Sequence, residues 1–214
     1  MNAEALVNLI RNTRSTGDEA YWGTSDFTPY YSFEFNGEFI KGERDIADRL
    51  ALMNYPDMTG ARYLDLGCNL GLFAMTTVKK HGASLAMGVD ADAHIVESAR
   101  HIAADRDISD KTIFVQGNLN DLTQEWVAAQ SGYDTFEYMS CFSVFRHIMK
   151  GGVLALPQFF VTVGKICTRS FFFENCAEIE TEQIIQCLQE VGFERADYLG
   201  RTERDRDLVV VHKG

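Results

Sequence analysis

A glycine-containing turn joins an apolar run to a helical one, a setting in which backbone N–H groups and a helix N-terminus face a bound nucleotide. The stretch YLDLGCNLGLF (63–73) holds Asp65 in the apolar run, then Gly67, Asn69 and Gly71 in the turn. The next apolar run, SLAMGV, ends at Asp90. An acidic side chain at that strand tip accepts hydrogen bonds from the ribose hydroxyls of a ligand lying across the turn. The two signals together predict a nucleotide site and leave the nucleotide open.

Each signal also has a purely structural interpretation. Tight strand-to-helix turns often need glycine for positive φ or close packing, and Asp90 is near enough to cap the following helix. Asp92 directly precedes the apolar stripe of that helix and suits the capping role better, so ribose binding is the favoured role for Asp90. The spacing Gly67-x-Asn69-x-Gly71 departs from the dinucleotide fingerprint G-x-G-x-x-G. An NAD-dependent oxidoreductase is therefore the less favoured alternative.

The elements that must position this turn alternate between apolar strands and amphipathic helices from residue 62 onward. We expect strands near 62–66, 85–89, 112–115, 138–142, 166–173, 194–199 and 207–212, and helices near 70–80, 93–105, 121–129 and 181–191. This alternation is typical of an α/β domain with a largely parallel sheet. Before it come an opening helix, an aromatic segment and a helix near 43–53. We expect an N-terminal cap or lid (1–55) and a main domain (56–214).

Composition limits the partners. A length of 214 residues suits one main fold, and no apolar run approaches the ~18 residues that cross a bilayer. The N-terminus lacks the features of a secretory signal, so we expect a cytoplasmic protein with no membrane partner. The five cysteines are odd in number and form no CxxC pair, which indicates reduced thiols and no metal site. The net charge of −11 disfavours nucleic acid, although Arg201, Arg204 and Arg206 cluster among acidic residues.

The motif LDLGCNLG resembles the first motif of the Rossmann-like (class I) S-adenosylmethionine (SAM)-dependent methyltransferases, acidic-x-G-x-G-x-G, with Asn69 at the central glycine. The resemblance covers roughly residues 60–212. VQGNLND (115–121) is similar to the turn that meets adenine, and FEYMSCFSVFRHI (136–148) to the fourth strand and its loop. It implies a seven-stranded, mostly parallel sheet flanked by helices, with the last strand antiparallel beside the fifth. It also implies SAM as cofactor and S-adenosylhomocysteine (SAH) as product.

The resemblance implies a cofactor site and a candidate catalytic residue. The implied cofactor-binding residues are Asp65, Gly67, Cys68, Asn69, Gly71, Asp90, Ala91, Asn118, Leu119 and Ser143. The Asn118 carbonyl would accept from the adenine amino group, and Asn69 tolerates left-handed backbone. His147 has the pKa range of a general base for an acceptor that must lose a proton, with packing in its loop as the equal alternative. Glu137 is expected to be structural. Lys41 and Arg44 either pair with the cofactor carboxylate or begin a solvated helix.

Sequence motifs that are missing after the fourth strand restrict the chemical class of the methyl acceptor. After the fourth strand there is no Asn/Asp-Pro-Pro-Tyr/Phe sequence and no Pro-Cys pair, which disfavours adenine, glutamine and cytosine-C5 methylation. With the acidic charge, this favours a small molecule bearing a hydroxyl or carboxyl group over an amine. A tRNA-modifying enzyme is the nearest alternative, because YSFEFNGEFIKGERD (31–45) is similar to the entrance segment of methyltransferases acting on wobble uridines. A non-catalytic relative of the fold is another. We expect most of the aromatic side chains of the N-terminal cap to pack in the hydrophobic core and the others to cover the substrate; they are Trp22, Phe27, Tyr30, Tyr31 and Phe33.

Overall fold

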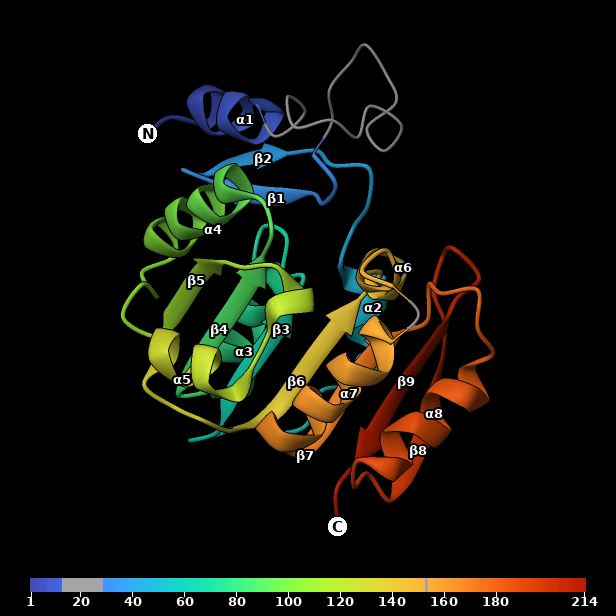
Figure 1. Ribbon diagram of the computed structural model, residues 1–214. Coiled ribbons are helices and arrows are strands. Elements are labelled where there is room, and N and C mark those ends of the chain that lie inside the picture. Colours follow the sequence, from blue (N-terminus) through green and yellow to red (C-terminus); the bar gives the residue numbers. More distant parts are fainter. Residues whose placement is uncertain (13–28, 153) are drawn as a thin grey trace.

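The computed structural model describes residues 1–12, 29–152 and 154–214, and its centre is a seven-stranded sheet (Figure 1). The strands are β3 (Arg62–Leu66), β4 (Leu85–Asp90), β5 (Thr112–Gln116), β6 (Phe136–Phe142), β7 (Cys167–Glu174), β8 (Arg195–Arg201) and β9 (Asp207–His212). Their order is β5-β4-β3-β6-β7-β9-β8. In this sheet β9 is antiparallel to both of its neighbours, whereas β3 to β7 pair in parallel. The predicted fold class, including the antiparallel last strand beside the fifth, is confirmed.

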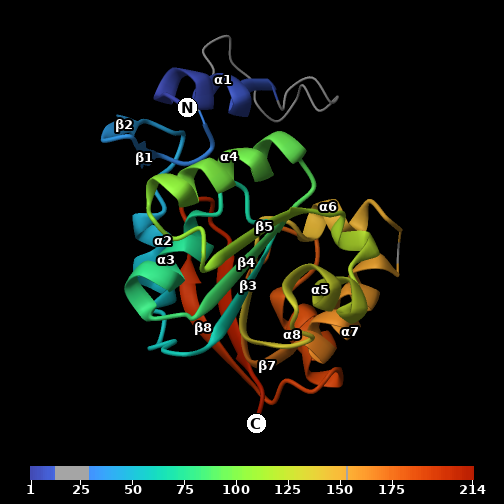
Figure 2. The same ribbon diagram turned by 90° about the vertical axis from the view of Figure 1, so that its left-hand side faces the viewer.

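Helices cover both faces of this sheet (Figure 2). They are α3 (Leu72–His81), α4 (Ala93–Asp105), α5 (Gln124–Ser131), α6 (Phe145–Met149), α7 (Ala155–Ile166) and α8 (Thr181–Glu190). One apolar core gathers under α3 and α4, and a second under α5 to α8. The predicted cap of α4 is confirmed, because the Asp92 side chain accepts from the backbone N–H groups of His94 and Ile95. Sequence reasoning did not predict α7, which contains a proline near its start. Pro157 lies in the first turn of α7, where a missing N–H costs the helix nothing.

The N-terminal part packs on the same core as α4. It contains α1 (Ala3–Asn12), the antiparallel pair β1 (Phe33–Phe35) and β2 (Glu38–Ile40), and α2 (Ala47–Met53). Leu6 and Phe33 are almost fully buried in that core. Asn36 and Gly37 both take positive φ, 51° and 74°, and connect β1 to β2. Asn-Gly is a strong signal for such a hairpin, and sequence reasoning passed over it. Trp22 and Phe27 lie outside the described residues.

Two negative findings apply to the described ranges. None of their helices combines the length and apolar character needed to cross a bilayer. Within the same ranges, no three side chains of histidine, cysteine, aspartate or glutamate gather as a metal ligand set.

Candidate functional site

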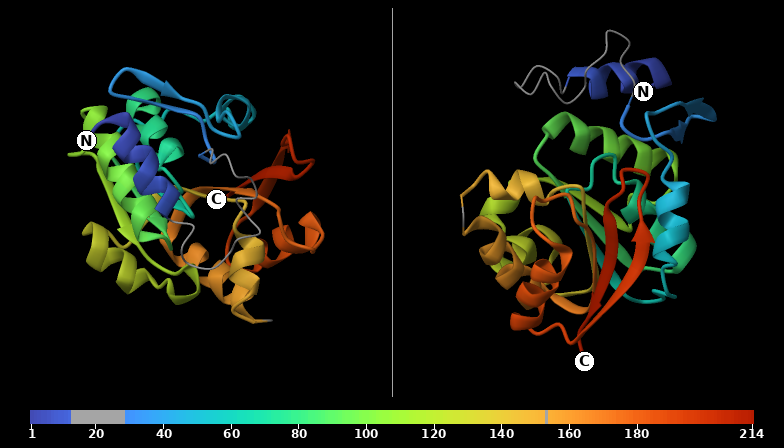
Figure 3. Two further views of the ribbon diagram at one scale, coloured as in Figure 1. Left: turned by 90° about the horizontal axis from the view of Figure 1, so that it is seen from above. Right: turned by 90° about the vertical axis from the view of Figure 1, so that its right-hand side faces the viewer.

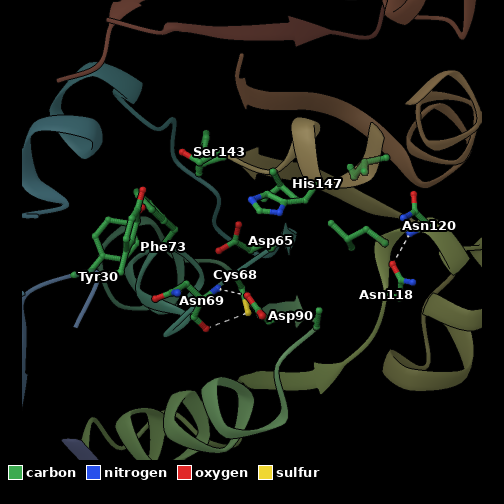
Figure 4. A pocket seen from close by; sticks show the side chains of 17 residues that line it. Tyr30, Asp65, Cys68, Asn69, Phe73, Asp90, Asn118, Asn120, Ser143 and His147 are labelled. Carbon is green, nitrogen blue, oxygen red and sulfur yellow. Dashed lines mark hydrogen bonds between the residues drawn. The ribbon is translucent and has the colours of Figure 1, made fainter. Parts of the chain in front are cut away.

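A cavity of about 320 Å³ opens at the carboxyl ends of β3, β4 and β6 (Figure 4). This is the edge at which open α/β sheets bind ligands. Of the predicted site residues, the cavity is lined by Asp65, Gly67, Cys68, Asn69, Asp90, Ala91, Asn118, Leu119, Ser143 and His147. It is also lined by Tyr30, Tyr31, Phe73, Asn120, Phe142, Val144 and Ile148. Asn120, Phe142, Val144 and Ile148 adjoin predicted positions in the chain, and that adjacency is the signal that could have found them. Tyr30 and Tyr31 are two of the cap aromatics that the sequence offered either as core or as cover for a substrate; Tyr31 is buried in the core and also lines the cavity.

The glycine turn is built so that the backbone passes close to its neighbours. Gly67 has φ 78°, and a Cβ there would lie 2.3 Å from Cγ2 of Val144. Gly71 has φ 70°, and its Cβ would lie 2.3 Å from Cε1 of Phe114. Asn69 takes the left-handed backbone expected of it, with φ 48°. Gly71 is not among the residues that line the cavity, and its close approach to Phe114 gives it a packing role between α3 and β5. Direct contact between Gly71 and a ligand stays a prediction.

Asp90 is held at the tip of β4 with both carboxylate oxygens oriented by main chain. Its Oδ2 accepts from Asn69 N at 2.8 Å, and its Oδ1 accepts from Asp92 N at 3.1 Å. Burial raises the pKa of Asp90, while these backbone N–H groups oppose that shift. Each carboxylate oxygen has a further lone pair. The arrangement suits a pair of ligand hydroxyl donors.

Asp65 lies deeper in the cavity and is only half satisfied. It is 1% exposed, and its Oδ1 accepts from Ser140 Oγ at 2.6 Å. Its Oδ2 has no hydrogen-bond partner among the described residues, and the same is true of Asn69 Oδ1. Burial raises the pKa of Asp65 to about 7; the Ser140 hydroxyl lowers it, and nearby Asp90 raises it. Two buried acceptor atoms without partners beside a cavity call for a ligand that donates hydrogen bonds, preferably with positive charge.

Asn118 lies at the end of the cavity away from Tyr30 (Figure 4). Its side-chain carbonyl accepts from Asn120 N at 3.1 Å and caps the short helical turn Leu119–Asp121. One lone pair of that carbonyl and the amide N–H groups remain for a ligand. Contact between Asn118 and adenine stays a prediction.

The remaining wall carries Ser143 and His147. Ser143 directly follows β6 with φ 60° and donates from Oγ to Glu174 Oε2, while Arg206 Nη1 donates to the same hydroxyl at 3.2 Å. His147 lies on α6, and its ring faces the same space as the Asp65 carboxylate (Figure 4). The structure thus brings the predicted base to the cavity.

A buried polar network behind this wall was not predicted. Arg49 is 1% exposed and donates to Tyr31 Oη at 2.7 Å and to Glu174 Oε1 at 3.2 Å. Glu174, fully buried, also accepts from Thr202 Oγ1 at 3.0 Å. These groups come from α2, β7 and the segment after β8, and no local pattern in the sequence links them.

Three other charged residues of the sequence analysis do not line the cavity. Arg44 pairs with Glu203, and its guanidinium lies 4.8 Å from the centre of the Tyr30 ring. Lys41 is exposed. Glu137 accepts from Arg62 Nη2 at 2.8 Å at the start of β6, a structural contact as expected.

Comparisons with known proteins agree with this geometry. Residues 33–130 match the family model described as Methyltransferase small domain. A segment of 64 residues is 39% identical to the ribosomal RNA small subunit methyltransferase C of Psychromonas ingrahamii and spans 30% of this chain but 18% of that relative. The S-adenosylmethionine dependent methyltransferase from Mesorhizobium loti has a TM-score of 0.57 at 19% identity, over 76% of this chain and 96% of its own. The bifunctional kinase-methyltransferase WbdD has a TM-score of 0.64 at 18% identity, over 94% and 45%. The structural likeness shows a shared fold.

Proposed function

We propose that the chain is a Rossmann-like (class I) SAM-dependent methyltransferase, which transfers the methyl group of SAM to a small-molecule acceptor and releases SAH; the family-model match over residues 33–130 and the shared fold support this proposal. The observation that carries this proposal is the set of acceptor atoms in the cavity. Asp90 offers oriented carboxylate oxygens at one strand tip, and Asp65 Oδ2 and Asn69 Oδ1 have no hydrogen-bond partner within the described part of the chain. A ribose with two hydroxyls, joined to a chain with a cationic amino group, satisfies both sets.

SAM supplies an electrophilic methyl group whose in-line transfer leaves a neutral thioether. The residues of this chain therefore act mainly by positioning and by excluding water. Phe73, Phe142 and Ile148 give the cavity apolar walls. His147 is the group proposed to accept the proton of a hydroxyl or amine acceptor, through an imidazole nitrogen that faces the cavity.

A small acceptor is favoured by the cavity and by charge. The walls around Ser143 and His147 come from α6, the end of β6 and the segment at Tyr30, and they form part of the same cavity of about 320 Å³ that contains the proposed cofactor positions. A net charge of −11 opposes long-range attraction of RNA.

Ribosomal RNA is the second candidate acceptor, since the relative from Psychromonas ingrahamii is named for it. The family-model match ends at residue 130, before β6 and α6. The elements on the acceptor side are thus outside that match. An RNA acceptor predicts binding that weakens steeply as salt rises, whereas a small acceptor predicts a shallow dependence.

The test is calorimetric titration with SAM and with SAH of the wild type and of Asp90→Asn. Removing charge from an oriented carboxylate costs about 1–3 kcal/mol per interaction, so affinity should fall by about five- to 150-fold. Asp110→Asn is the matched control, because Asp110 is exposed and precedes β5 at the opposite edge of the sheet. Absence of SAM and SAH binding in the wild type would contradict the proposal. Binding without turnover across an acceptor panel would favour the non-catalytic alternative.

A further inference from the structure

The three arginines that cluster in the sequence, Arg201, Arg204 and Arg206, have different surroundings in the structure. Arg201 is satisfied by acidic neighbours: its Nη1 lies 2.6 Å from Asp205 Oδ1, and its Nε lies 3.2 Å from Asp207 Oδ1. Arg204 and Arg206 instead approach the cavity wall. The Arg204 guanidinium lies 5.8 Å from the Tyr30 ring centre, and Arg206 donates to Ser143. Tyr30 and Ser143 both line the cavity.

The turn that carries these residues lies beside the N-terminal part of the chain. It spans residues 202–206 between β8 and β9, closed by hydrogen bonds from Thr202 N to Arg206 O and from Asp205 N to Thr202 O. Figure 3 shows the β8–β9 hairpin next to α2, and β8 contacts α2. The turn thus reaches the side of the cavity that holds Tyr30.

Charge does not balance on this wall. Three arginines of this wall, Arg44, Arg49 and Arg206, contact two carboxylates, Glu174 and Glu203. Arg49 is buried, and the side chains of Arg44 and Arg206 are 10% and 18% exposed. Arg204 beside Tyr30 is exposed and adds a fourth positive charge. Cations withdrawn from water need a counter-charge. The whole chain has a net charge of −11, so this excess of positive charge is confined to the wall beside Tyr30 and Ser143. It favours binding of an anion there.

The two arginines of the turn also have donors to spare. In the described part of the chain, Arg206 makes its contacts through Nη1, which leaves Nε and Nη2 without a protein partner. Arg204 faces the Tyr30 ring and makes no ion pair with a described residue. A guanidinium with free N–H groups binds a carboxylate or phosphate through two parallel hydrogen bonds.

We propose that the acceptor is a small anion, carrying a carboxylate or phosphate group, and that Arg204 and Arg206 recognise that group beside Tyr30 and Ser143. This inference rests on the proposed function and names its substrate class. The anionic group would lie on the Tyr30 side of the cavity, and the atom to be methylated would lie further in, near His147. Arg204 and Arg206 are specificity residues in this scheme and take no part in the chemical step.

The experiment uses the full chain saturated with SAH, so that the cofactor site is filled. Inorganic phosphate and acetate are titrated against sodium chloride at equal ionic strength, and the unfolding temperature is recorded. We expect phosphate to raise that temperature in the wild type. In Arg204→Gln/Arg206→Gln the apparent phosphate affinity should fall about tenfold or more, the scale of one charge-assisted hydrogen bond. Arg201→Gln, on the same hairpin, should keep wild-type phosphate affinity.

Two results would overturn the inference: no phosphate effect beyond chloride in the wild type, or equal loss in Arg201→Gln. A short RNA that binds with a steep salt dependence in the absence of a phosphate effect would overturn the small-molecule assignment. SAH affinity, measured on the same samples by calorimetry, separates the two proposals. It should be equal in the wild type and in the double variant, and its absence in the wild type would be a failure of the proposed function instead.

Discussion

The half-satisfied carboxyl group of Asp65 makes a sharp prediction about stability. Its pKa is raised from an ordinary value of 3.8 to about 7, mainly by burial. Well below pH 3.8 the group is protonated in both the native and the unfolded chain. As the pH rises toward 7 the unfolded chain loses the proton first, so the free energy of unfolding falls. Well above pH 7 both forms are ionised and the loss is complete.

The size of the effect follows from the two pKa values. Each pKa unit corresponds to 1.36 kcal/mol, so the full cost of Asp65 at neutral pH is about 4 kcal/mol. Between about pH 5 and about pH 8 the cost grows by about 2–3 kcal/mol. Asp65→Asn removes the titration and keeps an oxygen that accepts from Ser140 Oγ. The variant should therefore gain stability over the wild type as the pH rises, although it loses a ligand contact.

Urea unfolding of both proteins at about pH 5 and about pH 8 measures this difference, without SAM or SAH present. The stability difference between Asp65→Asn and the wild type should be larger at the higher pH by about 2–3 kcal/mol. Asp110→Asn controls for the removal of an exposed carboxylate and should show no such change. A difference that does not vary with pH, or a variant that loses stability at the higher pH, would refute the assignment of Asp65 as a buried, mostly protonated acid.

Three further predictions concern the cofactor, the turn and the buried network. SAM binding near pH 6 should release protons, because a cationic ligand favours the ionised form of Asp65; calorimetry in two buffers of different ionisation enthalpy detects the release, which should vanish in Asp65→Asn. Gly71→Ala should lower the free energy of unfolding by about 1–3 kcal/mol and lower the unfolding temperature with it, because the new Cβ would meet Phe114 and the residue would keep a positive φ. An unchanged unfolding temperature would contradict the packing of Gly71 against Phe114. Arg49→Met should destabilise by about 3–5 kcal/mol in urea, because it leaves Glu174 buried with less compensation, and Arg49→Met/Glu174→Gln should recover part of that loss.

Sequence patterns predicted the strands well because the sheet is buried on both faces. Runs such as LAMGV and FFF have few polar residues, and their ends coincide with turn residues. Asp90 was found because strand tips can be read from such runs. The helix α7 and the β1–β2 hairpin were missed because one proline and one Asn-Gly pair have meanings that depend on position within the element.

The cofactor half of the cavity was open to prediction because its side chains follow directly from strand ends. Cys68, Asn69 and Ala91 each come within a few residues of such an end. The wall behind Ser143 could not be predicted from the sequence, because Arg49 and Glu174 are 125 residues apart. Only the folded topology brings a charged position of a short helix against the last residue of a buried strand.

The placement of β9 between β7 and β8 has a consequence for synthesis on the ribosome. Of the seven strands β9 is made last, and until it is inserted β7 has a free edge that includes Phe171, Phe172 and Phe173. An unpaired apolar edge is prone to association with other chains. The turn between β8 and β9 also completes the wall beside Ser143, because Thr202 donates to Glu174 and Arg49 donates to Glu203. That wall therefore cannot form before β9 is in place. A nascent chain released early would thus hold the glycine turn while lacking half of its pocket, and it would be a natural client for chaperones that shield apolar edges.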